Sequence, residues 1–234
     1  MNVAINGPEI LGYLFGNTSL PITETMRNSW IIMAFILFLC IFLTRRMEKI
    51  PKGKQALAEK AVLMIDGLVD STMGEGCRAF SPYIMTLMMS SLFGSLASLF
   101  WMRSTTADLN TTLGWAIITF ILITYNKIKF GGIKGYLEPI FVMAPLNVLS
   151  EIATPVSMSF RHFGNMAGGL VITTLIMGAL KVLSNAVLGF LPVPLLQIGL
   201  PGVLSLYFDC FTACMQAFIF SMLTMAYVGD ARGS

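Results

Sequence analysis

The feature that most constrains this chain is a positive charge in its most apolar third. Between Ile152 and Gly229 the formally charged residues are Arg161, Lys181 and Asp209 alone. An arginine keeps its charge at any accessible pH, and placing one in a bilayer costs between ~3 and ~15 kcal/mol. We therefore expect the chain to use Arg161 rather than merely tolerate it.

Composition assigns the chain to the membrane. Of 234 residues, 56% are hydrophobic and 12% are charged, whereas soluble domains carry about 25% charged residues. We expect an all-α membrane protein with a single integral membrane domain over residues 1–234. The net charge of +3 is small and the basic residues cluster, so they report orientation and predict no nucleic-acid partner.

The cysteines predict no metal site. Cys210 and Cys214 are one helical turn apart, but no histidine or second thiol pair accompanies them, so the set does not match known metal-ligand spacings. The four cysteines lie mostly in apolar runs and are expected to act as small hydrophobic side chains. We expect neither a metal nor a cofactor.

Three spans are predicted in the first half of the chain, at residues 28–44, 80–102 and 109–126. Residues 1–27 lack the basic region and cleavage site of a signal peptide and are expected to form an irregular segment outside the membrane. Residues 55–75 are too charged to span and predict an amphipathic helix on the cytoplasmic surface. Its predicted apolar face consists of Leu57, Ala61, Met64, Ile65, Leu68 and Thr72.

Two basic clusters predict the orientation. Residues 45–60 contain six lysines and arginines, and Lys127, Lys129 and Lys134 follow the third predicted span. The positive-inside rule places both clusters in the cytoplasm. The N-terminus is then outside, and about five crossings leave the C-terminus inside.

The remainder, residues 139–228, predicts a long hydrophobic helical hairpin. One limb runs to about residue 188 and the other covers 203–228, with the segment GFLPVPLLQIGLPG between them. Its three prolines, Pro192, Pro194 and Pro201, oppose a straight helix. Both limbs exceed the ~20 residues of a perpendicular span, so we expect them to be steeply tilted.

Each limb carries a polar stripe. Spacings of three, four and seven place one set of residues near one face of the first limb: Thr154, Ser157, Arg161, Asn165 and Gly168. A matching set lies on the second limb: Ser205, Asp209, Thr212 and Gln216. Hydrogen bonding between helices is the ordinary role of such hydroxyls, and a purely architectural Arg161–Asp209 salt bridge is the corresponding alternative for the two charges.

Three further polar residues flank these stripes. Glu151 is either an interfacial residue or part of an aqueous entrance, and the sequence leaves both readings open. His162 could shuttle protons, but it lies about 100° around the helix from Arg161, which favours packing. Lys181 is expected to reach toward the outer surface.

The segment PLNVLSEIATPVSMSFRHFGNMAGG (145–169) resembles the signature of subunit a of F-type ATP synthases. Two further segments are similar to the same family, TADLNTTLGWA (106–116) and YFDCFTACMQAFIFSMLTMAYV (207–228). The order and spacing of the three motifs also fit, over roughly residues 25 to 230.

The resemblance implies a stator subunit that passes ions rather than an enzyme with catalytic residues of its own. Two aqueous half-channels would carry H⁺ or Na⁺ to and from the carboxylates of a c-subunit ring, separated by the family's essential arginine at Arg161. Gln216 and Asn165 match family positions near that arginine, Asp209 falls where relatives carry an ionisable channel residue, and Ser157 and Glu151 complete the expected ion path. Further implied partners are the peripheral-stalk b subunits, the rest of the ATP synthase and membrane lipid.

Two positions depart from the family pattern. Leu170 stands where many relatives have an ionisable residue, and Asn147 replaces an acidic residue, so different groups are expected to carry the relay here.

The implied location is the plasma membrane of a bacterium. A small secondary transporter with an Arg–Asp substrate site is the alternative function, but this chain shows no repeated halves; a structural scaffold would tolerate loss of Arg161.

Overall fold

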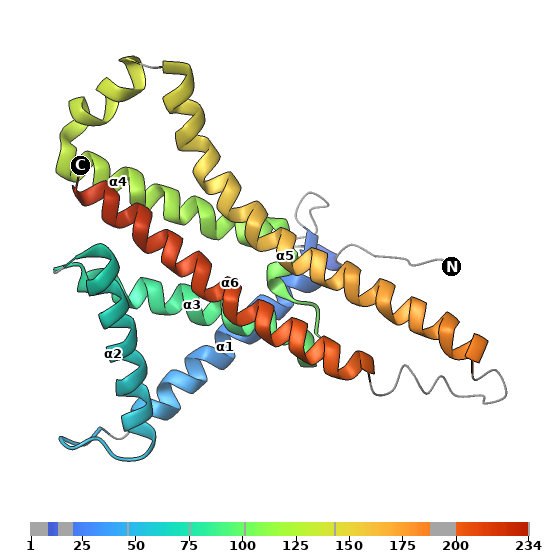
Figure 1. Ribbon diagram of the computed structural model, residues 1–234. Helices are drawn as coiled ribbons and strands as arrows, with labels where there is room; N and C mark the ends of the chain where they lie inside the picture. The colour runs from blue at the N-terminus through green and yellow to red at the C-terminus, as the bar shows by residue number, and fades with distance from the viewer. Residues whose placement is uncertain are drawn as a thin grey trace.

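The computed structural model describes residues 9–13, 21–45, 47–74, 76–100, 102–142, 144–187 and 200–233. It confirms the all-α membrane class: five helical segments are long and apolar enough to cross a bilayer. They are Glu24–Thr44, Arg78–Phe100, Leu109–Gly132, Ile152–Ser184 and Asp209–Arg232. The long helices α5 and α6 run antiparallel and extend beyond the other helices at one end of the molecule (Figure 1).

The N-terminal segment is more ordered than the sequence predicts. Strands β1 (Ile10–Tyr13) and β2 (Pro21–Thr23) pair antiparallel, so the expectation of an irregular segment is wrong for these residues. Thr23 then caps α1 (Glu24–Thr44), because its Oγ1 accepts a hydrogen bond of 3.4 Å from the Met26 amide. The hairpin therefore leads directly into the first spanning helix.

Helix α1 is held mainly at its start. Asn28 is fully buried, and its Nδ2 donates a 3.0 Å hydrogen bond to the Arg103 carbonyl, in the connection between α3 (Ser81–Leu96) and α4. Farther along α1 the apolar side chains point outward; Leu37 and Phe38 are 63% and 66% exposed. Such a surface is suited to lipid rather than water.

Helix α2 (Lys54–Met73) packs across the end of the bundle where α6 terminates (Figure 1). Its buried edge is Ile65, Val69 and Met73, which join Met225 and Val228 of α6 in one core cluster. Of the predicted apolar face, Leu57 and Met64 are instead 65% and 57% exposed. The apolar surface of this helix thus divides into an edge that packs on α6 and an edge that faces outward.

Helix α4 (Leu109–Val142) continues past the predicted end of the third span and includes Lys127 and Lys129. It is interrupted at Gly132, whose φ of +71° is a left-handed conformation that favours glycine. Helices α5 (Ala144–Val187) and α6 (Leu200–Gly233) form the predicted hairpin. Pro192 and Pro194 lie outside the described residues.

Pro201 lies in the first turn of α6, where a missing N–H breaks no intrahelical bond.

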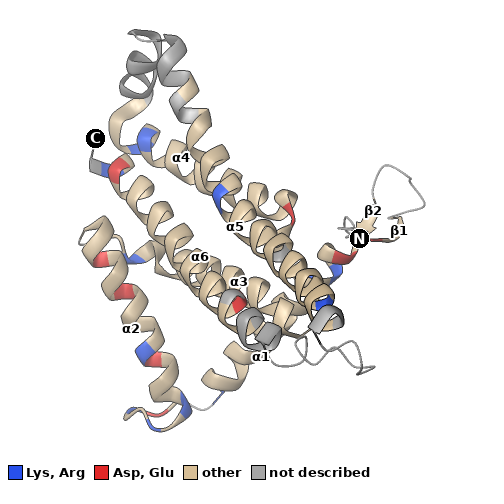
Figure 2. Ribbon diagram, turned by 45° about the vertical axis from the view of Figure 1, so that its right-hand side comes forward, with Lys and Arg blue, Asp and Glu red and all other residues tan. Residues whose placement is uncertain are grey.

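The second span consists of α3 with a 3₁₀ turn at each end, Arg78–Phe80 before it and Ala97–Phe100 after it. A further 3₁₀ turn, Thr105–Ala107, leads into α4. Charged residues are concentrated on α2 and near helix ends, whereas long stretches of the bundle contain none (Figure 2).

A close approach at Gly229 yields a stability prediction. A Cβ atom added there would lie 3.2 Å from Met73 Cα and 3.5 Å from the Thr72 carbonyl oxygen. Because both neighbours are backbone atoms, we expect Gly229→Ala to destabilise the α2–α6 contact by about 1–3 kcal/mol. The measurement is the midpoint of thermal denaturation in detergent.

The matched control is Gly67→Ala on α2, where an added Cβ would meet no atom within 4 Å. There the higher helix propensity of alanine is expected to leave the midpoint unchanged or raise it. Equal midpoints for Gly229→Ala and the unmodified chain would show that α2 does not depend on this contact.

Candidate functional site

Two adjacent files of side chains define the central part of α5. Ser157, Arg161 and Asn165, each one turn after the last, are exposed. The residues that follow them, Met158, His162 and Met166, are buried, with 3%, 1% and 7% exposure. Successive residues on a helix are 100° apart, so one file faces outward while its neighbour faces the bundle. We call Ser157, Arg161 and Asn165 the outward file.

The buried side of α5 is anchored to three helices. Ser159 Oγ and Thr112 Oγ1 of α4 are 3.1 Å apart, within hydrogen-bonding distance. His162 Nε2 and Ser91 Oγ of α3 form a second contact at 3.2 Å. Phe220 of α6 completes the set, because its ring centroid lies 5.3 Å from that of His162. These contacts leave the outward file free of the bundle.

Arg161 is exposed and forms no hydrogen bond or ion pair with any described residue. Its neighbour Phe160 is 54% exposed, and Ile152, nine residues earlier on α5, is 55% exposed. An isolated guanidinium in apolar surroundings is strongly disfavoured unless a counter-charge or water reaches it. Within the described residues, the counter-charge of Arg161 is not supplied by this chain.

The architectural salt bridge between Arg161 and Asp209 is therefore wrong for this structure. Helix contacts explain the separation: Phe220 packs beside His162, and Asp209 lies eleven residues before Phe220 on α6. At 1.5 Å per residue this is about 16 Å along the helix axis. Asp209 is half-buried and has interactions of its own.

Gln216 is placed one turn before Phe220, about 6 Å along the axis of α6. It is 4% exposed, so it faces the bundle rather than the surface that carries Arg161. Of the predicted site residues, the structure brings Ser157, Arg161 and Asn165 onto one face and places Gln216 and Asp209 elsewhere on the hairpin. Glu151 belongs to α5, but its side chain is outside the described residues.

Sequence reasoning missed the residues that hold α5 in place. Ser91 is fully buried on α3, and the rings of Trp115 and Phe220 both pack edge-on against His162. A lone serine and two aromatic residues inside apolar helices look like ordinary core. The signal that could have found them is His162, a polar residue on the buried face of α5, which needs a polar partner on a neighbouring helix.

A polar cluster at the start of α4 supports the same region. Thr106 Oγ1 lies 2.9 Å from both Ser95 Oγ and Ser104 Oγ, and Ser104 Oγ donates to the Gly94 carbonyl at 3.1 Å. A Cβ at Gly94 would collide with Thr105 Oγ1. This compact turn sets where α4 begins and so where Thr112 meets α5.

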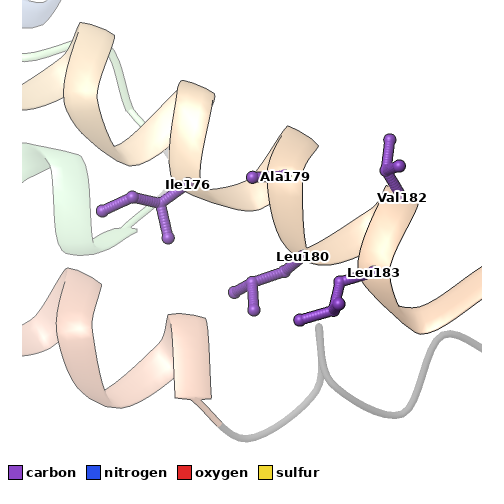
Figure 3. A pocket seen from close by; sticks show the side chains of 5 residues that line it. All are labelled: Ile176, Ala179, Leu180, Val182 and Leu183. Atoms are coloured by element: carbon purple, nitrogen blue, oxygen red, sulfur yellow. The ribbon is translucent and has the colours of Figure 1, made fainter. Parts of the chain in front are cut away.

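An apolar groove of 620 Å³ lies on α5 beginning at Ile176, fifteen residues after Arg161; Figure 3 shows the side chains that line it. Its described lining is aliphatic: Ile176, Ala179, Leu180, Val182 and Leu183. These five described lining residues carry no ionisable side chain. The groove is suited to lipid chains or to apolar protein surface.

Comparison with known proteins identifies the family. The profile of the ATP synthase A chain matches residues 26–229. The chain is 33% identical to "ATP synthase subunit a, sodium ion specific" of Propionigenium modestum, over 91% of this chain and 75% of the relative. It is 31% identical to "ATP synthase subunit a 2" of Bradyrhizobium sp., over 94% of each chain.

A third relative, "ATP synthase subunit a" of Moorella thermoacetica, is 32% identical over 90% of this chain and 91% of its own length. The family match covers every helix from α1 to nearly the end of α6. The resemblance inferred from three motifs is confirmed: this chain belongs to the ATP synthase A chain family, whose members are ion-translocating membrane subunits and not catalytic ones.

Proposed function

We propose that this chain is the stator subunit of a rotary F-type ATP synthase and that its outward file faces the c-subunit ring. The observation that carries the proposal is the state of Arg161, a permanent cation in a spanning helix without a counter-charge among the described residues of its own chain. A ring whose subunits each present a carboxylate would supply that counter-charge. The exposed apolar residues around Arg161 suit such a protein surface.

Electrostatics then assigns the role of Arg161. A fixed cation stabilises the ionised form of a carboxylate opposite it, so a ring site arriving there must have released its ion. The same cation repels ions that would pass directly between the two half-channels. Interactions between charges are several-fold stronger in a region of low dielectric than in water, which makes one arginine an effective barrier.

The remaining predicted residues line the approach to this barrier. Asp209, about 16 Å from Phe220 along α6, is proposed as a titratable lining of the outer half-channel. Ser157 and Asn165 provide polar groups on the same face as Arg161, Gln216 provides one inside the hairpin, and Glu151 marks the cytoplasmic approach. Leu170 supplies no ionisable group, so Asp209 carries a larger share of the outer path.

Contacts at one end of the bundle support the proposed orientation. The Arg232 guanidinium lies 4.9 Å from the Phe130 ring centroid, and Lys129 Nζ lies 5.7 Å from the same ring. The basic end of α4 and the C-terminal end of α6 are therefore together. Both belong in the cytoplasm by the positive-inside rule, with the N-terminus outside, in a bacterial plasma membrane.

The proposed partners follow from this placement. The c-subunit ring covers the outward file, the peripheral-stalk b subunits and the rest of the ATP synthase complete the complex, and lipid covers apolar surfaces such as that of α1. The transported ion is H⁺ or Na⁺. Its identity depends on the ring carboxylate, and the sodium-specific relative shows that one member of the family uses Na⁺.

Cross-linking tests whether the outward file meets the ring. Single cysteines are introduced at Asn165 and at Met166 after the native cysteines are replaced, and each is labelled with a photoactivatable maleimide in the assembled complex. Asn165→Cys is exposed and is expected to cross-link to a c subunit; Met166→Cys, its buried neighbour, is the matched control. Cross-links from Asn165→Cys to lipid alone would contradict the proposal.

A further inference from the structure

We infer that His162 is a positioning residue for Arg161: its contacts with α3, α4 and α6 set the rotation of α5 that points Arg161 outward. This inference rests on the proposed function of Arg161. The two residues are adjacent in the chain, yet one is exposed and the other is 1% exposed. Whatever fixes the ring of His162 therefore fixes the direction of Arg161, 100° away on the same helix.

The ring of His162 is held by three helices at once. Ser91 of α3 contributes the 3.2 Å contact between its Oγ and His162 Nε2. The ring of Trp115 of α4 lies 5.9 Å away at an interplanar angle of 68°, and that of Phe220 of α6 lies 5.3 Å away at 67°. Trp115 and Phe220 also contact each other at 6.3 Å. Edge-to-face rings at these distances have a preferred geometry.

A purely space-filling residue does not explain this site. His162 Nδ1 is buried and has no hydrogen-bond partner among the described residues. Burying this nitrogen costs free energy, and an aliphatic side chain of similar size would avoid that cost. What the imidazole provides in exchange is a directional bond to Ser91, which aliphatic packing lacks. Phe220 also follows Gln216 by one turn, so the same contact sets the register between Arg161 and Gln216.

A small rotation would be sufficient to misplace Arg161. Side chains extend 5–6 Å from the helix axis, so a rotation of α5 by about 20° moves a side-chain tip by roughly 2 Å. Displacements of about 1 Å can lower the rate of a geometrically demanding step about a hundredfold. Loss of the His162 contacts is therefore expected to impair coupling even when the subunit still assembles.

The test compares four variants of the assembled ATP synthase in inverted vesicles, measuring ions pumped per ATP hydrolysed and the amount of assembled complex. We expect His162→Leu to lower the pumping ratio about tenfold and Ser91→Ala about threefold, as loss of one buried hydrogen bond predicts. His162→Gln, whose amide reaches toward Ser91, is expected to restore most of the ratio. Tyr83→Phe is the control, because it removes a partly buried 3.1 Å hydrogen bond between α3 and α4, from Tyr83 to Thr119, that involves none of the partners of His162.

A merely structural role would reduce the amount of complex but not the ratio. Unchanged ratios in His162→Leu and Ser91→Ala would overturn the inference; if His162→Leu does not assemble, Ser91→Ala decides it. Arg161→Ala is measured in parallel. Pumping retained in Arg161→Ala would contradict the proposed function itself, whereas loss there with normal ratios in the other variants would overturn only the role of His162.

Discussion

Replacing Arg161 by alanine is expected to abolish ATP-driven ion pumping while the complex still assembles. Arg161 is exposed and bonds to no described residue of its own chain, so its removal breaks no intramolecular contact there. In the proposed function, what is lost is the cation opposite the ring carboxylate and the barrier between half-channels. We expect pumping in inverted vesicles to fall by at least about a hundredfold, the scale of losing a close charge interaction in an apolar region.

Two companion variants make this result specific. Arg161→Lys is expected to be a poor substitute, because a lysine is a point charge that loses its proton more readily when desolvated. Lys181→Ala is the matched control: it removes an exposed cation from the same helix, away from the proposed barrier. Normal pumping in Arg161→Ala, or equal losses in Arg161→Ala and Lys181→Ala, would contradict the assignment.

Replacing Asp209 by leucine is expected to slow pumping by at least about tenfold, because an apolar side chain removes both a titratable group and a site that holds water in the membrane. Asp209 is half-buried on α6 and Leu170 offers no substitute. Asp209→Glu keeps the carboxylate and is expected to retain most of the activity. The measurement is the initial rate of ion uptake by inverted vesicles at matched amounts of assembled complex.

The control for Asp209 is Asp230→Asn at the opposite end of α6, where the side chain is exposed. It should leave the rate of uptake unchanged. If Asp209→Leu pumps as fast as the unmodified enzyme, the outer half-channel does not depend on this carboxylate, and another group must line it.

Much of the fold follows from the sequence because membrane helices obey simple rules. Runs of uncharged apolar residues predicted the spans, and the two predicted limbs of the hairpin correspond to α5 and α6. The same rules were insufficient where packing decides. The buried edge of α2 is Ile65, Val69 and Met73, whereas Leu57 faces outward. Which edge is buried depends on how α2 packs on α6, where Gly229 approaches the backbone of Met73 closely. Helical periodicity within α2 alone cannot show this.

The site divides in the same way. Helical spacing was enough to place Ser157, Arg161 and Asn165 on one face, since that depends on a single helix. The distance between Arg161 and Asp209 depends on the register between two helices, which the ring contact of His162 with Phe220 sets. For the same reason the sequence did not reveal that Gln216 would be buried or that Ser91 would meet His162.

The most direct test of the barrier is passive ion flux through the membrane sector with the ring immobilised by cross-linking to the stator. Without the catalytic head, the unmodified complex should then conduct no ions, because each ion must travel with the ring past Arg161. Arg161→Ala is predicted to leak with the ring immobilised, since nothing separates its half-channels. If the immobilised Arg161→Ala complex is as tight as the unmodified one, Arg161 is not the barrier between them.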